Sequence, residues 1–351
     1  MDFFNAIALV ANFILLPGLT YGSQLALGAL GVTLIYAVLR FSNFAHGELM
    51  SFGAMICILF TWLGQSYGVS FGFLPTALLF VPIAMIFTIL YCILIEKLVF
   101  SYYREKKSNP IIFLIASIGV MFFTAGLIRF IIGPSDQSFN DGVRFIFTVR
   151  EFKALTGLNE GFGLKTSQAI TILTTIILCS LLFFFLNKTR TGKSMRAFSD
   201  NEDLALLSGI DPNKVVLLTW IIAGGLATFA GVLYGLDKIY KPFIFLQMLL
   251  PIFSAAIVGG VGNPLGAFIG GYIIALSELF VTFAYKRGLG YMLPEDLEPT
   301  TMMQFLSTDY KFAVSFIILV IVLIIKPTGI FSGKTIRQIF KDALSSLFLS
   351  L

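Results

Sequence analysis

The sequence predicts an all-α protein that crosses a membrane many times. Hydrophobic residues make up 57% of the 351 residues and charged residues only 12%, roughly half the charged share of a soluble domain. The mean hydropathy of +0.92 agrees, because lipid must solvate most of such a chain. Long apolar runs recur along it, and a bilayer core about 30 Å thick needs roughly 20 helical residues to cross it.

About ten apolar runs are candidates for crossings. They lie near 6–17, 22–39, 49–64, 74–98, 110–132, 167–186, 215–236, 247–260, 265–284 and 310–326. The first run is the weakest, since it is short before Pro17-Gly18 and could form an interfacial helix instead. No basic residue precedes it, which disfavours a signal peptide. We therefore expect one transmembrane domain over residues 1–351.

A polar segment, 40–48, separates two of these runs and carries the only histidine of the chain. It places Asn43, His46 and Glu48 between segments of membrane length. In lipid, polar groups need partners, so such a break is buried in protein, lines a watery cavity or lies at the interface. We expect a broken or re-entrant helix here, and either a functional site or a structural knot of hydrogen bonds.

A second break is expected near 259–266, where Asn263-Pro264 follows a glycine-rich run. Proline lacks an N–H and restricts the residue before it, so a helix should be interrupted there. Gly262, Gly266 and Gly270 are spaced four apart. On a helix this spacing would align all three on one face and let another backbone approach closely.

Ionisable and nucleophilic residues inside the spans are few. Arg129, near the end of its run, is expected to snorkel to the interface. Glu278 is an isolated carboxylate within a span. A hydrogen bond to a neighbouring helix and a role in a transport pathway explain its presence there equally well. The three cysteines, Cys57, Cys92 and Cys179, suit neither a disulfide framework nor a zinc site and are expected to be small buried hydrophobes.

Catalytic and cofactor motifs are incomplete. A single histidine excludes any site that needs two, and the glycines that resemble phosphate loops or a dinucleotide fingerprint lack the required spacing and strand. We therefore expect no catalytic, cofactor or metal site on this chain.

Basic residues in the loops predict the orientation. Lysine and arginine are more numerous in the loops 97–109, 187–214 and 326–351 than in the loops 133–166, 237–246 and 285–309. The first set should therefore be cytoplasmic, with 133–166 and 285–309 as the larger extracytoplasmic loops. With ten crossings, both termini would face the cytoplasm.

The loop 187–214 is expected to hold a short amphipathic helix. Ser199 or Asp200 can cap it, its first turn is acidic, and Gly209 can end it. From these residues alone, a solvated linker and a contact surface for a partner are equally good explanations.

Six motifs follow one another along the chain. They are Asn43-Phe44-Ala45-His46-Gly47-Glu48, the run from Arg190 to Ala197, Leu207-Ser208-Gly209-Ile210, the run from Ala223 to Leu233, the glycine segment from Val258 to Gly271, and Lys326-Pro327-Thr328-Gly329-Ile330-Phe331. In this order they resemble the permease of branched-chain amino-acid ABC importers of the LivH type. Asp203-Leu204-Ala205 followed by Gly209 also resembles the Glu-Ala-Ala-x-x-x-Gly coupling loop of ABC importers, with departures at its first two positions.

The resemblance implies a multi-pass permease of the bacterial inner membrane, paired with a second permease that is related or identical. Two cytoplasmic ATPases, which bind ATP and Mg, would drive it, and an extracytoplasmic binding protein would deliver the cargo. Branched-chain or related amino acids are the expected cargo, with urea or short amides as alternatives within the family. A transporter or channel that works without ATPases is the alternative class.

The resemblance also gives residues expected roles. A translocation pathway or gate would include Asn43, His46, Glu48, Gly262, Asn263 and Glu278, with the bracing of helices as the rival role of the first three. Contact with the ATPases would involve the cytoplasmic coupling loop 187–214, in particular Gly192, Arg196, Ala197, Asp203, Ala205, Gly209 and Ile210.

Overall fold

The computed structural model describes residues 2–291 and 303–331. The prediction of an all-α polytopic membrane protein is confirmed. Within this part of the chain, eight helical segments are long and apolar enough to cross a membrane, and a ninth apolar helix is shorter. The apolar helices are α2 (Leu16–Leu39), α3 (His46–Ser66), α4 (Ala77–Ile95), α6 (Pro110–Ile132), α8 (Thr166–Lys188), α11 (Pro212–Asp237), the shorter α12 (Ile244–Gly259), α13 (Pro264–Thr282) and α15 (Lys311–Ile325).

Short elements extend or connect these helices. They are α1 (Asp2–Val10), η1 (Ala11–Leu15), η2 (Glu96–Phe100), α5 (Ser101–Glu105), β1 (Phe145–Phe147), α7 (Val149–Thr156), β2 (Leu164–Lys165), α9 (Arg190–Asp200), α10 (Glu202–Leu207), α14 (Lys286–Gly290) and η4 (Thr308–Tyr310). Both predicted breaks are present, one between α2 and α3 and the other between α12 and α13.

The first two apolar runs form one helix rather than two separate segments. The segment Asp2–Leu39 is continuous over 38 residues, about 57 Å at 1.5 Å per residue. Pro17 does not break it, because the π-helical turn η1 lies directly before the proline and wider turns accommodate a missing N–H. The helix is longer than a bilayer core is thick.

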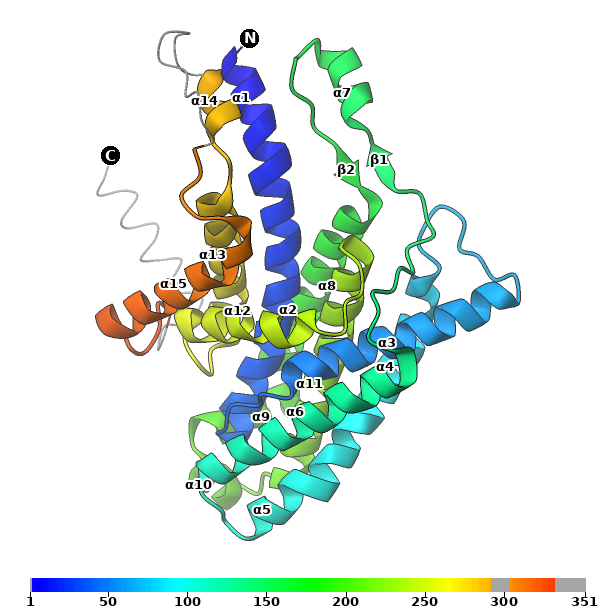
Figure 1. Cartoon of the computed structure of the whole chain (residues 1–351). Coiled ribbons are helices and arrows are strands. Elements are labelled where there is room, and N and C mark those ends of the chain that lie inside the picture. Colours follow the sequence, from blue (N-terminus) through cyan, green and yellow to red (C-terminus); the bar gives the residue numbers. More distant parts are fainter. Residues whose placement is uncertain (1, 292–302, 332–351) are drawn as a thin grey trace.

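The loops lie at two opposite ends of the molecule (Figure 1). Elements α7 and α14, from the loops predicted to be extracytoplasmic, lie at one end. Elements α5, α9 and α10, from the loops predicted to be cytoplasmic, lie at the other. The N-terminus lies at the α7 end, contrary to the expectation that it shares a side with α9. The C-terminal residues from 332 onward lie outside the described part.

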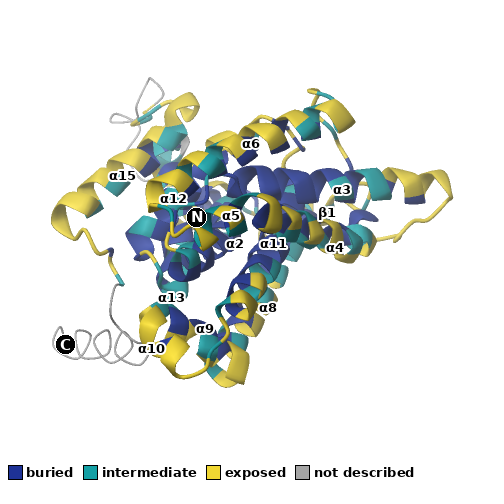
Figure 2. Cartoon of the chain, turned by 90° about the horizontal axis from the view of Figure 1, so that it is seen from below, coloured by how far each residue is buried: buried dark blue, intermediate teal, exposed yellow. Residues whose placement is uncertain are grey.

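Helix α2 forms the centre of the fold. Of its 24 residues, 20 are buried, so protein rather than lipid surrounds it. It packs against α8, α11, α12 and α13, and Figure 2 shows the buried residues gathered around α2, α3 and α11, with exposed residues along α15 and α6. The three cysteines are free and buried, as expected.

Three long helices begin with the same device. Asn109, Asp211 and Asn263 each precede a proline, and each side-chain oxygen accepts a hydrogen bond from a backbone N–H in the first turn. The side chain satisfies a backbone donor that the new helix leaves free, and proline has no N–H to leave unpaired. These residues therefore fix where α6, α11 and α13 start.

The loop 133–166 folds into a small unit against the N-terminal helix. Strands β1 and β2 pair antiparallel within it, and the side chains of Asn5 and Asn12 accept hydrogen bonds from Glu160 N and Gly163 N, at 3.1 Å each. Asp141 accepts hydrogen bonds at 2.8 Å from Thr76 N and from the Gln65 side chain. Although partial burial opposes ionisation, these bonds lower the pKa of Asp141.

Glycines allow α12 and α13 to touch at the backbone. A Cβ on Gly266 would lie 2.1 Å from the Gly259 carbonyl oxygen, and one on Gly270 would lie 2.1 Å from the Ala255 carbonyl oxygen. The spacing predicted that Gly262 would share this face, and that prediction is wrong. It lies in the break before α13, with a φ of +84° that favours glycine.

Candidate functional site

The break between α2 and α3 is held by its own polar groups. Helix α2 ends at Leu39, the next residue, Arg40, has a left-handed φ of 59°, and α3 begins at His46. The Asn43 side-chain oxygen accepts a hydrogen bond from Ala45 N at 3.1 Å, and Phe44 N donates to the Ser117 hydroxyl of α6 at 3.2 Å. The segment therefore has a defined conformation.

The break returns the chain to the middle of α2. A Cβ on Gly31 would lie 2.4 Å from Cε1 of His46, so the imidazole lies directly against the helix near its midpoint. A Cβ on Gly47 would lie 2.6 Å from the carbonyl oxygen of Phe245, in the first turn of α12. The N-terminal ends of α3 and α12 thus meet beside the centre of α2, and helix N-termini carry partial positive charge.

Buried polar atoms without partners gather at this junction. Asn43, His46 and Glu48 are each no more than 1% exposed. Among the described residues, no hydrogen bond reaches Asn43 Nδ2, either ring nitrogen of His46 or either carboxylate oxygen of Glu48. The Gly28 backbone interacts with the imidazole without forming a hydrogen bond to it. Most buried polar groups are paired, so these atoms indicate a place for water or a solute.

Arg129 belongs to the same junction, which the sequence did not indicate. Its guanidinium lies 4.1 Å from the Phe243 ring centroid, its Nε is buried, and it interacts electrostatically with Glu48. Arg129 itself is only half-buried, and its snorkelling to the interface stays a prediction. Tyr240 joins the group through a 2.9 Å hydrogen bond with the Ser51 hydroxyl. In the sequence, Arg129 is visible only as an arginine within a span and Tyr240 only as a tyrosine after a span. Neither pattern shows that the two residues contact α3.

The second break lies elsewhere along α2. Gly262 and Asn263 line a cavity of about 280 Å³ together with the end of α2 and with Arg196, Ser199 and other residues of α9 and nearby segments. The Asn263 side chain donates a 2.7 Å hydrogen bond to the Phe331 carbonyl, and Ile330 N donates to the Val258 carbonyl. The segment after α15 thus ties down this break.

Arg40 connects the first break to α9. Its guanidinium donates a hydrogen bond to the Ser199 carbonyl, in the last turn of that helix. Sequence reasoning did not assign Arg40 a role, because no local pattern predicts a contact 159 residues away.

The loop 187–214 contains two helices rather than one. The basic stretch forms α9, and Asn201, not Ser199 or Asp200, caps α10 by accepting a hydrogen bond from Leu204 N at 3.0 Å. Gly209 follows α10 with a φ of +79°, as a helix-ending glycine should. The predicted coupling residues lie together on this pair: Gly192, Arg196 and Ala197 on α9, Asp203 and Ala205 on α10, and Gly209 and Ile210 just after it.

Glu278 does not join either break. It is buried on α13, and the Ser315 hydroxyl of α15 donates a hydrogen bond to its Oε1. The predicted bond to a neighbouring helix is therefore present, while Oε2 has no partner among the described residues.

Comparison with known proteins shows the family of this chain. The family model described as the permease component of the branched-chain amino acid transport system matches residues 14–323. The chain belongs to this family. The permease is accordingly a multi-pass membrane protein, and its curated relatives are transport permeases rather than enzymes.

Relatives from several organisms match over nearly the full chain. The high-affinity branched-chain amino acid transport permease LivH of Escherichia coli K12 is 30% identical, over 92% of this permease and 96% of the relative. The permease BraD of Pseudomonas aeruginosa is 26% identical, over 93% of this permease and 97% of the relative. A probable LivH of Methanocaldococcus jannaschii is 29% identical, over 91% of this permease and 92% of the relative.

Proposed function

We propose that this permease is the membrane subunit of an ATP-driven importer for branched-chain or related amino acids. One observation carries the proposal beyond the family assignment: two helix N-termini and a set of unpaired polar side chains meet beside the middle of α2. A solute crossing at this depth would find hydrogen-bonding groups that lipid cannot offer. Asn43, His46 and Glu48 would line or shape this part of the pathway.

The proposed complex places the α9–α10 end in the cytoplasm of a bacterial cell, against two ATPases that bind ATP and Mg. The opposite end, with α7, α14 and the N-terminus, would receive an extracytoplasmic binding protein. A second permease, related or identical, completes the pathway. Closure of the ATPases would move α9 and α10, and Arg40 would transmit that movement to the α2–α3 break as a rigid-body coupling.

Reconstitution tests this function. We expect the permease, co-expressed with the ATPases and second permease of its own gene neighbourhood, to import leucine into liposomes only with ATP and the cognate binding protein. A urea or amide importer would instead move those solutes. Uptake that persists without ATPases would contradict the proposal and favour an independent transporter or channel.

Reversing one charge on α9 should weaken the link to the ATPases. In Arg196→Glu we expect less ATPase co-purification or stimulation, because this exposed cation would lie at the contact.

Adding a side chain at Gly209, as in Gly209→Val, should also lower ATPase co-purification or stimulation, because it strains a residue with a φ of +79°. Lys214→Glu is the matched control, since Lys214 is 80% exposed at the far end of the loop. Normal co-purification and stimulation of both variants would show that the contact lies elsewhere.

His46 allows packing to be separated from polarity. Replacing it with alanine should impair uptake, but the ring also fills space against Gly31. His46→Phe keeps an aromatic ring and removes the polar nitrogens, so in the pathway role it should lose uptake while the complex still assembles. If His46→Ala or His46→Phe assembles and transports normally, the pathway role of this imidazole is wrong.

A further inference from the structure

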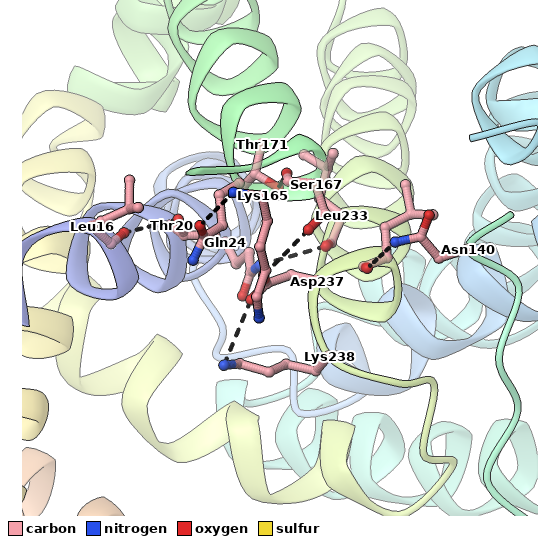
Figure 3. A network of polar contacts seen from close by, with 12 residues as sticks. Leu16, Thr20, Gln24, Asn140, Lys165, Ser167, Thr171, Leu233, Asp237 and Lys238 are labelled. Carbon is pink, nitrogen blue, oxygen red and sulfur yellow. Dashed lines mark hydrogen bonds and ion pairs between the residues drawn. The ribbon is translucent and has the colours of Figure 1, made fainter. Parts of the chain in front are cut away.

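A second group of polar residues lies where α2, α8, α11, α13 and α15 approach the loops proposed to be extracytoplasmic. Figure 3 shows part of it: the Gln24 amide of α2 donates to the Leu233 carbonyl of α11 at 3.4 Å, and Asp237 at the end of α11 faces Ser167 and Lys238. Glu278 and Lys311 continue the group on α13 and α15, beside Tyr21 of α2. We call Tyr21, Gln24, Glu278 and Lys311 the outer cluster.

Buried atoms of the outer cluster lack partners. Tyr21 is 7% exposed, Gln24 is not exposed and Glu278 is 1% exposed. In the part of the chain that the structure describes, Gln24 Oε1 has no hydrogen-bond partner, and the Tyr21 hydroxyl and the Glu278 carboxylate face each other without forming a hydrogen bond. Tyr21 and Gln24 are three apart on a helix and so share a face. A hydroxyl and a carboxylate oxygen therefore lie close together, and the Gln24 amide oxygen lies on the same face of α2 as the hydroxyl.

The charges of the outer cluster are close but not joined. The Lys311 ammonium lies 5.2 Å from the Tyr21 ring centroid and 4.7 Å from the Phe312 ring centroid. It interacts electrostatically with Glu278 and with Lys238. No ion pair within 4.0 Å is present between Lys311 and Glu278 in the described structure. By contrast, Asp237 already forms an ion pair with Lys238, with 3.7 Å between Asp237 Oδ2 and Lys238 Nζ.

We propose that the outer cluster is the outward reception site for the backbone of a zwitterionic amino acid. The substrate ammonium would bind the free oxygen of Glu278, and its carboxylate would bind Lys311. Tyr21 and Gln24 would complete the hydrogen bonds, and Lys238, whose side chain is 53% exposed, would attract the carboxylate from solvent. A bound zwitterion bridges the two unjoined charges, which a neutral solute such as urea cannot do. This site rests on the proposed function.

A purely structural role of Glu278 makes a different prediction from a binding role. The Ser315 hydroxyl needs only an oxygen acceptor, and Glu278→Gln keeps one. The ammonium of a substrate needs a negative charge, because charge-assisted hydrogen bonds are the stronger ones. Glu278→Gln should therefore keep the α13–α15 contact and lose substrate binding.

The test measures leucine uptake by the reconstituted complex at several concentrations of loaded binding protein. We expect Glu278→Gln and Lys311→Met to raise the half-saturating concentration or lower uptake by about tenfold or more, with unchanged thermal stability of the complex. Lys311→Arg keeps the charge and should retain most uptake. Lys241→Gln is the matched control, because Lys241 is a half-exposed outward lysine already paired with Asp136 at 2.8 Å.

The outcomes separate this site from the proposed function. Wild-type complex that imports no amino acid would contradict both. Wild-type uptake with normal kinetics in Glu278→Gln and Lys311→Met would overturn only the reception site. If Glu278→Gln lowers thermal stability and uptake together while Lys311→Met is normal, Glu278 pins α15 and the site is likewise rejected.

Discussion

Replacing Gly266 with alanine is expected to lower the thermal stability of the purified permease and its yield from membranes. The added Cβ would lie 2.1 Å from the Gly259 carbonyl oxygen. That neighbour is backbone, which cannot rotate away as a flexible side chain can, so α12 and α13 must separate. Overpacking in tight cores costs about 1–3 kcal/mol and sometimes more, and Gly266→Val should be worse than alanine.

A lipid-facing glycine provides the control for this prediction. Gly126 on α6 has nothing within 4 Å of the position that a Cβ would occupy, and Gly126→Ala should leave stability unchanged or slightly raised, since alanine favours helix more than glycine does. The melting temperature of the detergent-solubilised protein measures both. Equal melting temperatures for Gly266→Ala and wild type would mean that α12 and α13 do not meet at the backbone here.

Replacing Arg40 with alanine is expected to separate ATP hydrolysis from transport. The guanidinium of Arg40 bonds to the Ser199 carbonyl of α9 across 159 residues of chain, and it is the side chain that links the α2–α3 break to that helix. Without it, α9 could still move with the ATPases while the break stays in place. Leucine uptake should fall by about tenfold or more, equivalent to roughly 1.4 kcal/mol, while ATP hydrolysis stimulated by the binding protein persists.

Backbone effects at Arg40 need their own variant. Its φ of 59° is unfavourable for residues other than glycine, so Arg40→Gly removes the side chain and relieves the backbone at once. Both Arg40→Gly and Arg40→Ala should be uncoupled, and Arg40→Lys should retain part of the uptake. Parallel loss of uptake and ATPase stimulation would indicate failed assembly, and normal uptake would show that Arg40 carries no coupling.

Local patterns in the sequence were enough to predict the helices and both breaks. Apolar length predicted most membrane helices, and Asn263-Pro264 predicted the second break because proline chemistry is local. The same approach failed at Pro17, where a π-helical turn accommodates the proline. Because the first two apolar runs form one helix, the number of crossings falls by one, and the N-terminus lies at the end opposite to the one expected.

Contacts between distant segments were not predictable in the same way. The segment 40–48 was identifiable as a site because polar residues interrupt lipid-length runs, but its neighbours Gly31, Phe245 and Arg129 come from three other helices. Glu278 and Gly262 were expected in the same pathway on the strength of the resemblance, and the structure places them apart from the segment 40–48. No local period encodes which helix faces which, so a single sequence could nominate residues but not assemble them.

The glycines of α2 have a mechanical consequence. Gly18 and Gly22 receive side chains of α13, Gly28 receives Ile252 of α12, and Gly31 receives His46 of α3. Each of these side chains fits into a notch on α2, so the neighbouring helices interlock with it. A helix that slid along α2 would first have to withdraw its side chain from the notch. Helix α2 therefore holds α3, α12 and α13 in register, and a transport movement is expected to carry these helices together as one body.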